Sequence, residues 1–455
     1  MEITLDKLST EANKERLLIF TQSEKIFWAL IIFFSAATNL KIADIQLSEL
    51  SLAAIFLIYF SRIIDSNFKF ENFRYLRKLS QHFGYFIILC FILMLANQFQ
   101  DFYPPASATS FLKKPFILSL VRLSQVLMVL LSFILVSRKL GQNFRHLTFF
   151  VKVYILTGLL CSIHAILSYI ALQQFGINLL GAYETEFSVR ARGLFVEGGP
   201  FGLYLVSVFV VIFVYHHNIQ KIKFGYLVFL IGTIGIALSL SASKAGLLAL
   251  VSAILMALVL SKKKNIKVIF LTTFSLGLLS WGLFSFFSEQ FIGYFNSYLL
   301  TSSSKNSANI DSEDPSVVMG RVAGMIIVPK MIQERPFIGI GIGNYPLIRN
   351  DLKYLGSLPT VSGWDLPGLG LFGNTAELGI PLSIYFIIIL LNPFLLIRKK
   401  MPKQTTLIVA ALYPIIAFGL GVQITFLYPW LVLGMTLGIT FHKLRQTIQP
   451  SPLCH

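Results

Sequence analysis

Long apolar runs alternate with short polar segments along most of the chain. A helix of about 20 apolar residues is long enough to cross the hydrocarbon core of a bilayer. The runs predict about twelve such helices, at residues 26–43, 45–61, 83–99, 115–137, 148–172, 200–215, 224–241, 245–260, 268–288, 373–397, 404–420 and 423–441. The pattern therefore predicts an all-α, polytopic membrane protein built as a helical bundle.

Composition supports this prediction. The chain has 455 residues, of which 55% are hydrophobic and 13% charged, and its mean hydropathy is +0.73. Soluble domains carry about 25% charged residues. The three cysteines follow no spacing typical of a metal site or a disulfide framework. We expect no cleavable signal peptide, because the first segment is polar and of mixed charge.

The net charge of +17 reflects topology. Most Lys and Arg residues fall in alternate polar segments, among them 62–82, 261–267 and 398–403. By the positive-inside rule these segments face the cytoplasm, which places both termini there. The basic excess then attracts anionic lipid headgroups, and no nucleic-acid partner is expected.

This topology divides the chain into three parts: about nine spans in 1–288, a large extracytoplasmic loop in 289–372, and about three spans with a cytoplasmic tail in 373–455. Within the loop, apolar residues recur near helical spacing around Arg321. That spacing predicts an amphipathic helix lying on the membrane surface, with a kink at Pro329.

One candidate for anion binding precedes the span at 200–215. Arg190 and Arg192 lie beside Glu197 and a Gly-Gly-Pro200 turn. Guanidinium groups bind phosphate in a bidentate way, so this cluster is typical of an anion site. The alternative is a pair of interfacial arginines that extend to lipid headgroups.

Two further cations lie where lipid would make them costly. Lys244 falls in the tight turn Ser241-Ala-Ser-Lys244 between two spans, and Arg122 lies inside a span. Ionisable groups at membrane depth are candidates for function, or they are paired structural residues.

The loop carries a third group of candidates. Arg335-Pro336 precedes Gly339-x-Gly341-x-Gly343-Asn344, which predicts a turn, since no strand–turn–helix unit of a nucleotide site surrounds it. Asp365, Asn374 and Glu377 follow in a polar stretch that runs into the span at 373–397. Glu377 is either a proton acceptor or the structural partner of an arginine.

Other chemistries are disfavoured. No Asp-x-Asp pair suggests a metal site, and the seven histidines fall in spans or on the predicted cytoplasmic side. Zinc hydrolysis and nucleophilic triads are therefore not expected, and we predict no cofactor.

These motifs, taken in order, resemble the O-antigen ligase/polymerase family over roughly residues 185–395. The resemblance rests on Arg192-Gly193 with Pro200, on Ser243-Lys244-x-Gly246, on Gly320-Arg321, on Arg335-Pro-x-x-Gly339-x-Gly341-x-Gly343-Asn344-Tyr345, and on Asn374-x-x-Glu377-Leu-Gly. It implies a GT-C-like bundle of about twelve spans in the bacterial inner membrane, with a large periplasmic loop and neither metal nor nucleotide.

The resemblance also implies the reaction. Members of the family transfer a glycan from undecaprenyl pyrophosphate to an acceptor sugar. Ligases of the family usually have a His nine residues before the Glu of Glu-Leu-Gly, where this chain has Gly368. That difference favours a polymerase of repeat units, with ligation to lipid A core or another acceptor as the alternative. A glycolipid transporter or flippase is the rival of another class.

Roles follow from this implied reaction. Arg192 and Arg321 would stabilise the departing pyrophosphate, supported by Arg190, Lys244 and Arg335. Arg122, Asn374 and Asn344 would contact substrate, and Glu197, Asp365 or Glu377 would accept the proton. The expected partners are undecaprenyl-pyrophosphate-linked oligosaccharides as donor and acceptor, membrane lipids, a chain-length regulator and a flippase.

Overall fold

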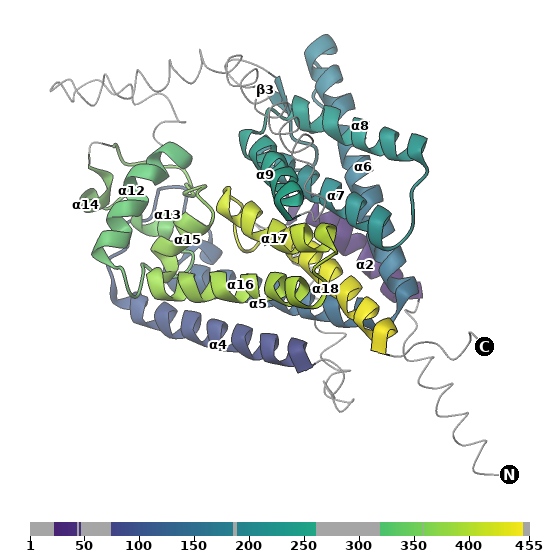
Figure 1. Cartoon of the computed structure of the whole chain (residues 1–455). Helices are drawn as coiled ribbons and strands as arrows, with labels where there is room; N and C mark the ends of the chain where they lie inside the picture. Colours follow the sequence, from purple (N-terminus) through teal and green to yellow (C-terminus); the bar gives the residue numbers. More distant parts are fainter. Residues whose placement is uncertain are drawn as a thin grey trace, which may run out of the picture.

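The computed structural model describes residues 22–42, 45–46, 74–184, 189–260, 319–356 and 358–448. This part of the chain is mostly helical, with few strand residues, which confirms the predicted all-α class (Figure 1). Its strands form two short antiparallel hairpins: β1 (Lys41–Ile42) pairs with β2 (Ile45–Gln46), and β3 (Ala182–Glu184) pairs with β4 (Val189–Ala191).

Five described helices are long and apolar enough to cross a membrane. They are α4 (Arg74–Ala96) continued by η2 (Asn97–Phe99), α5 (Pro115–Gln142), α6 (Phe144–Phe175), α7 (Gly198–Asn218) and α16 (Ile380–Lys400). The other helices of the bundle are α2 (Gln22–Ser35), α8 (Phe224–Leu240), α9 (Lys244–Leu260), α17 (Thr405–Gly419) and α18 (Leu427–Ile448). These apolar helices establish a polytopic membrane bundle.

Most predicted spans overlap these helices, although α4 begins at Arg74, nine residues before the predicted start, and α18 ends at Ile448, seven residues after the predicted end. The span predicted at 26–43 is shorter, because α2 ends at Ser35. The span at 268–288 and most of that at 45–61 lie outside the described residues.

Aromatic packing joins four helices to α18. The Trp430 ring of α18 lies 6.0 Å from Phe83 on α4 and 6.0 Å from Phe133 on α5, measured between ring centroids. Phe386 on α16 and Phe418 on α17 lie 6.1 and 5.4 Å from the same ring. Buried aromatic pairs of this kind add to the burial of apolar area, so they fix how the helices cross.

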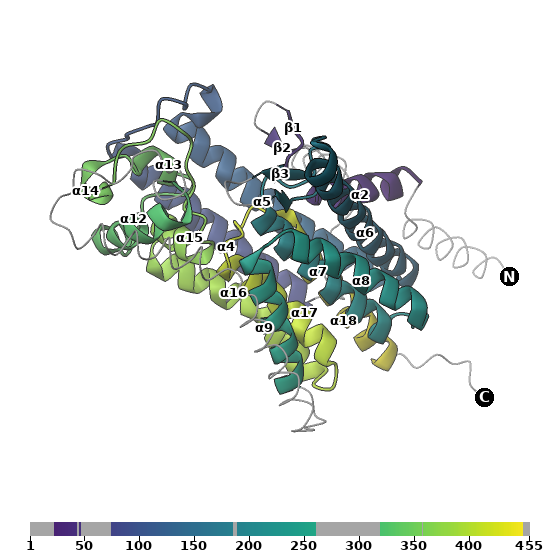
Figure 2. The same ribbon diagram turned by 90° about the horizontal axis from the view of Figure 1, so that it is seen from above.

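A second, smaller core lies at one end of the bundle. It is formed by α12 (Arg321–Glu334), α13 (Tyr345–Ile348), α14 (Leu352–Leu355) and α15 (Leu371–Leu378), which lie together in both views (Figures 1 and 2). We refer to α12, α13, α14 and α15 as the end cluster.

The short turn η3 (Phe111–Lys113) lies just before α5.

The helix predicted around Arg321 is confirmed as α12. Ala323, Ile327 and Met331 are fully buried in the end cluster, packed with Tyr345 and Tyr354. The apolar side of α12 therefore packs on protein, because later segments of the chain supply a core for it.

The span predicted at 373–397 is two helices, separated at Gly379. The backbone of Gly379 has φ +75°, and a β-carbon there would lie 2.4 Å from the Phe337 carbonyl oxygen. Backbone hydrogen bonds from Ile340 to Ala376 and from Ile380 to Pro336 hold the glycine turn against this break. Glu377 therefore belongs to the end cluster and precedes the spanning helix.

Candidate active site

A large cavity lies where the bundle meets the end cluster. Its volume is about 640 Å³, and its lining comes from the β3–β4 hairpin, the starts of α7, α9 and α12, one side of α5, and the turn between α17 and α18. Four cationic side chains line it: Arg122, Arg190, Lys244 and Arg321. Segments that are far apart in the sequence thus bring four positive charges to one cavity.

Arg190 is held by backbone carbonyl groups. It lies on β4 opposite Tyr183, and its guanidinium carbon is 5.9 Å from the centre of that ring. Its Nε and Nη2 atoms donate to the Ser241 carbonyl oxygen, and Nη2 also donates to the Ala242 carbonyl at 3.0 Å. Three hydrogen bonds leave little rotamer freedom, so the charge is fixed at the cavity wall.

The turn between α8 and α9 positions both Arg190 and Lys244. Ala242 has φ +47°, which is uncommon for a residue with a side chain. Ser243 donates its hydroxyl to the Gly199 carbonyl oxygen at 3.1 Å and accepts the Gly246 N–H at 3.0 Å, which caps the start of α9. Lys244 is the first residue of α9, and the cap therefore places it at the cavity.

Arg321 extends across the cavity from the start of α12. Its stem lies over Gly368, whose β-carbon, if present, would be 3.0 Å from Arg321 Cγ. Its Nη2 atom lies 3.2 Å from the β-carbon position of Gly199 and 3.5 Å from that of Gly421. The guanidinium therefore lies between the first turn of α7 and the α17–α18 turn.

The N-terminus of α7 adds to the positive potential. Glu197 is its exposed N-cap residue, and Gly199 and Pro200 of the first turn line the cavity. Helix N-termini carry unpaired N–H groups and a partial positive charge, which favour anions. Among the described lining residues Glu197 is the acidic side chain of this cavity.

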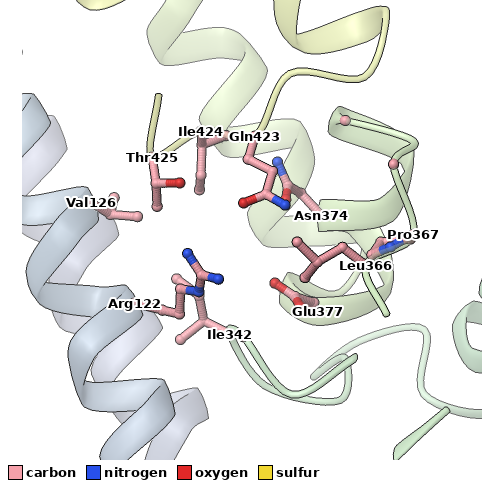
Figure 3. A pocket seen from close by; sticks show the side chains of 13 residues that line it. Arg122, Val126, Ile342, Leu366, Pro367, Asn374, Glu377, Gln423, Ile424 and Thr425 are labelled. Carbon is pink, nitrogen blue, oxygen red and sulfur yellow. The ribbon is translucent and has the colours of Figure 1, made fainter. Parts of the chain in front are cut away.

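A small pocket of about 40 Å³ adjoins the main cavity. The two share Arg122, Leu366, Gly368, Gln423 and Thr425 in their walls. Figure 3 shows the Arg122 guanidinium and the Glu377 carboxylate facing each other, with the amides of Asn374 and Gln423 close together beyond them. Arg122 also donates from Nη1 to Gln125 Oε1 at 3.0 Å.

Backbone groups orient Glu377. Its carboxylate accepts the N–H of Tyr345, at 3.4 Å, and that of Gly343. Burial raises the pKa of Glu377, although these N–H groups and the charge of Arg122 act in the opposite direction. The carboxyl group therefore holds a proton more readily than an exposed glutamate does.

Part of the chain that forms this site matches a known protein family. Residues 226–387 match the family model Wzy_C, described as O-antigen ligase. The chain carries a domain of the O-antigen ligase/polymerase family. No curated protein matches it.

The matched region of the O-antigen ligase domain holds Lys244, Arg321, Asn374 and Glu377. Arg122 and Arg190 precede it in the sequence and complete the cavity from α5 and β4. The family consists of glycosyltransferase-like ligases and polymerases, so at this level the protein is an enzyme of surface-polysaccharide assembly.

Two arginines that the sequence analysis assigned to the pyrophosphate, Arg192 and Arg335, are not among the residues that line either cavity. Arg192 follows the end of β4 and donates to the carbonyl oxygens of Leu180 and Val196 at 3.2 and 3.1 Å. Arg335 donates to Asn97 Oδ1 at 3.0 Å, which ties the end cluster to α4. Both guanidinium groups are thus hydrogen-bonded to other parts of the protein beside the site.

Asp365 and Asn344 are likewise structural in this arrangement. Asp365 is 3% exposed, lies 3.4 Å from Nε of fully buried Arg349, and accepts the Gly320 N–H at 2.7 Å. Burial raises the pKa of Asp365 despite the charge of Arg349. Asn344 is fully buried and accepts from Ser119 Oγ at 2.9 Å, joining α5 to the glycine turn.

The structure adds site residues that the sequence analysis missed. Gln423 and Thr425, in the α17–α18 turn, line both cavities, and Tyr183 and Phe426 line the larger one. The signal for Gln423 and Thr425 is a pair of polar residues in an otherwise apolar stretch. Within the described part of the chain, no group of three or more His, Cys, Asp and Glu residues is arranged to hold a metal ion.

Proposed function

We propose that the protein is a surface-polysaccharide polymerase that joins undecaprenyl-pyrophosphate-linked repeat units at the periplasmic face of the bacterial inner membrane. The observation that carries this proposal is the set of four cations, Arg122, Arg190, Lys244 and Arg321, around one cavity of about 640 Å³. The distribution of Lys and Arg along the sequence supports an orientation in which this cavity opens away from the cytoplasm.

The donor fits the charge of the cavity. In the proposed reaction, an acceptor hydroxyl attacks the anomeric carbon of the donor glycan and the bond from that carbon to the phosphate oxygen breaks. Undecaprenyl pyrophosphate leaves with the electron pair, and the hydroxyl proton passes to a carboxylate. Fixed guanidinium groups stabilise the charge that develops on the leaving group, and each such donor contributes about 10²–10³ in rate.

Arg190, Lys244 and Arg321 are assigned to the pyrophosphate. They line the cavity beside the N-terminus of α7. Their combined positive charge would stabilise the leaving pyrophosphate, as a divalent cation does in other transferases. We therefore expect the reaction to proceed with a chelator present. Holding two membrane-bound substrates in one cavity supplies a further part of the acceleration.

Polymerisation is preferred to ligation because of the residue at position 368. The described lining of both cavities contains no histidine, and Gly368 lies under the stem of Arg321. The histidine that the resemblance associates with ligases therefore has no counterpart at this position.

Complementation of a deletion strain tests the proposal. Wild type, Arg190→Ala and Arg321→Ala are expressed in the deletion host, and the surface polysaccharide is separated on a gel. We expect wild type to restore a ladder, and each variant to leave a single repeat unit. Long chains retained on the lipid carrier in the deletion strain would instead indicate a ligase, and an unchanged ladder would contradict both.

A further inference from the structure

The small pocket beside Arg122 differs in chemistry from the main cavity. Its polar walls are two carboxamides, one hydroxyl and one carboxylate, from Asn374, Gln423, Thr425 and Glu377, with the single cation Arg122 at the border. Amide, hydroxyl and carboxylate groups both donate to and accept from sugar hydroxyls. The cationic side of the site thus suits an anion, and this side suits a neutral sugar.

One polar atom in the pocket has no partner. The Asn374 side-chain nitrogen is buried and makes no hydrogen bond, although the amides of Asn374 and Gln423 face each other in Figure 3. A buried donor left unpaired costs free energy, so a ligand or water that accepts from it is favoured. Asn374 and Glu377 both line this pocket.

Size limits what can enter. A volume of about 40 Å³ holds about three water-sized groups. A sugar ring is too large for it, whereas a single hydroxyl with its carbon fits. The ring that carries the hydroxyl would remain in the main cavity, which shares Arg122, Gln423 and Thr425 with the pocket.

From these observations we infer that the small pocket is the acceptor subsite, in which Asn374, Gln423 and Thr425 hold the attacking sugar hydroxyl and Glu377 takes its proton. This inference rests on the proposed glycosyl transfer. The oxygen of the hydroxyl forms the new bond to the anomeric carbon, its proton moves to Glu377, and undecaprenyl pyrophosphate leaves toward Arg190, Lys244 and Arg321.

Position decides between the two carboxylates that line the cavities. Glu197 caps α7 on the side of Arg190 and Lys244, where the pyrophosphate is assigned. Glu377 lies on the other side of Arg122 and is oriented by the N–H groups of Gly343 and Tyr345. Of the described carboxylates that line the two cavities, Glu377 is therefore the one placed away from Arg190 and Lys244.

The surroundings of Glu377 also suit a base. The charged and titratable side chains that act on it among the described residues are Arg122 from α5 and Tyr345 from α13. Burial raises its pKa, which makes the carboxylate a stronger proton acceptor than an exposed one. Arg122 lines both cavities, so it can orient the acceptor hydroxyl toward the donor.

Steady-state kinetics of the purified, reconstituted full-length enzyme tests the subsite. The variants are Glu377→Gln, Gln423→Leu and Thr425→Val, with Glu334→Gln as the control, because Glu334 is a glutamate of the end cluster whose partner is the surface residue Lys353. Binding of undecaprenyl pyrophosphate reports on the donor side. The acceptor is the repeat-unit oligosaccharide released from the host polysaccharide.

We expect Glu377→Gln to lower kcat about 10²-fold or more and to abolish the acid limb of the pH profile. Gln423→Leu and Thr425→Val should raise KM for the acceptor about tenfold. All three should bind undecaprenyl pyrophosphate within about twofold of wild type, and Glu334→Gln should match wild type throughout.

The inference is overturned if Glu377→Gln keeps the acid limb and most of its activity, or if the pocket variants lose carrier binding as severely as Arg321→Ala. Failure of the proposed function has a different signature. In that case, wild type forms no new glycosidic bond, or Arg321→Ala remains fully active.

Discussion

The Arg190 guanidinium is bound to the end of α8, with its Nε and Nη2 atoms 3.2 and 3.1 Å from the carbonyl oxygen of Ser241. The carbonyl groups at a helix C-terminus carry partial negative charge, so they stabilise the cation without neutralising it. The same α8–α9 turn carries Lys244 at the start of α9. Two cations of the cavity thus depend on one turn.

Arg190→Lys should lower activity about 10²-fold, because lysine keeps the charge but loses the forked geometry. The matched control is Arg192→Lys, two residues away but outside the cavity, which should lose less than about tenfold. Polymer formation by membranes normalised for protein content measures both. Equal losses in the two variants would contradict the assignment of the site to Arg190.

Asp365→Leu should destabilise the protein, since it removes the carboxyl group that lies beside the buried Arg349 guanidinium and accepts the Gly320 N–H. Removing one member of a buried ion pair costs about 3–5 kcal/mol. The double variant Asp365→Leu with Arg349→Met should be less destabilised than the sum of the single changes. Thermal unfolding in detergent measures the effect. A stable but inactive Asp365→Leu would instead make Asp365 a catalytic group.

Gly368→Ala should displace Arg321. The backbone at Gly368 has φ +59°, and the added β-carbon would lie 3.0 Å from Arg321 Cγ. A left-handed conformation costs a non-glycine residue about 1 kcal/mol, and the shifted guanidinium should lower activity about tenfold or more. Gly232→Ala is the control, because its β-carbon would meet nothing within 4 Å. Unchanged activity in Gly368→Ala would count against the role of Arg321.

Glu377→Gln should stabilise the fold at neutral pH while lowering activity. Burial raises the pKa of Glu377, so the folded state binds the proton more tightly than the unfolded state. This contribution to stability is complete below the unfolded-state pKa of about 4.3 and is lost as pH rises through the higher folded pKa. Glutamine does not ionise and avoids the loss.

The unfolding midpoints of wild type and Glu377→Gln, compared at about pH 4 and about pH 8, measure this effect. The advantage of the variant should grow with pH. A difference of the opposite sign would show that Glu377 is stabilised as the carboxylate in the folded protein.

The sequence predicted the bundle well because each spanning helix is encoded locally by its own apolar run. Contacts between distant segments were harder to predict. Helical spacing correctly indicated α12, but its apolar side packs on Tyr345 and Tyr354, which come from later in the chain. Helical spacing alone could not predict these packing partners.

In the candidate site, too, features with a local sequence signal were predicted and those that depend on long-range contacts were not. Arg190, Lys244 and Arg122 were identified from the sequence because cations inside or next to apolar spans are conspicuous. Arg321 was identified through the family resemblance. The distinction between Arg190 and Arg192 depends on where β4 ends, at Ala191, and on the Ser241 carbonyl 51 residues away. Neither the end of β4 nor the distant Ser241 carbonyl can be predicted from the local sequence pattern. Gln423 was missed for the same reason, because its place at the site depends on contacts between distant segments.

Glycosyl transfer from undecaprenyl pyrophosphate, with Arg190, Lys244 and Arg321 stabilising the leaving group, can be followed directly. The most direct test supplies purified, reconstituted enzyme with lipid-linked repeat units from the host, in the presence of a chelator. We expect a ladder of lipid-linked polymer with wild type and none with a folded Arg321→Ala variant. Transfer that is lost with the chelator, or that persists unchanged in Arg321→Ala, would contradict this expectation.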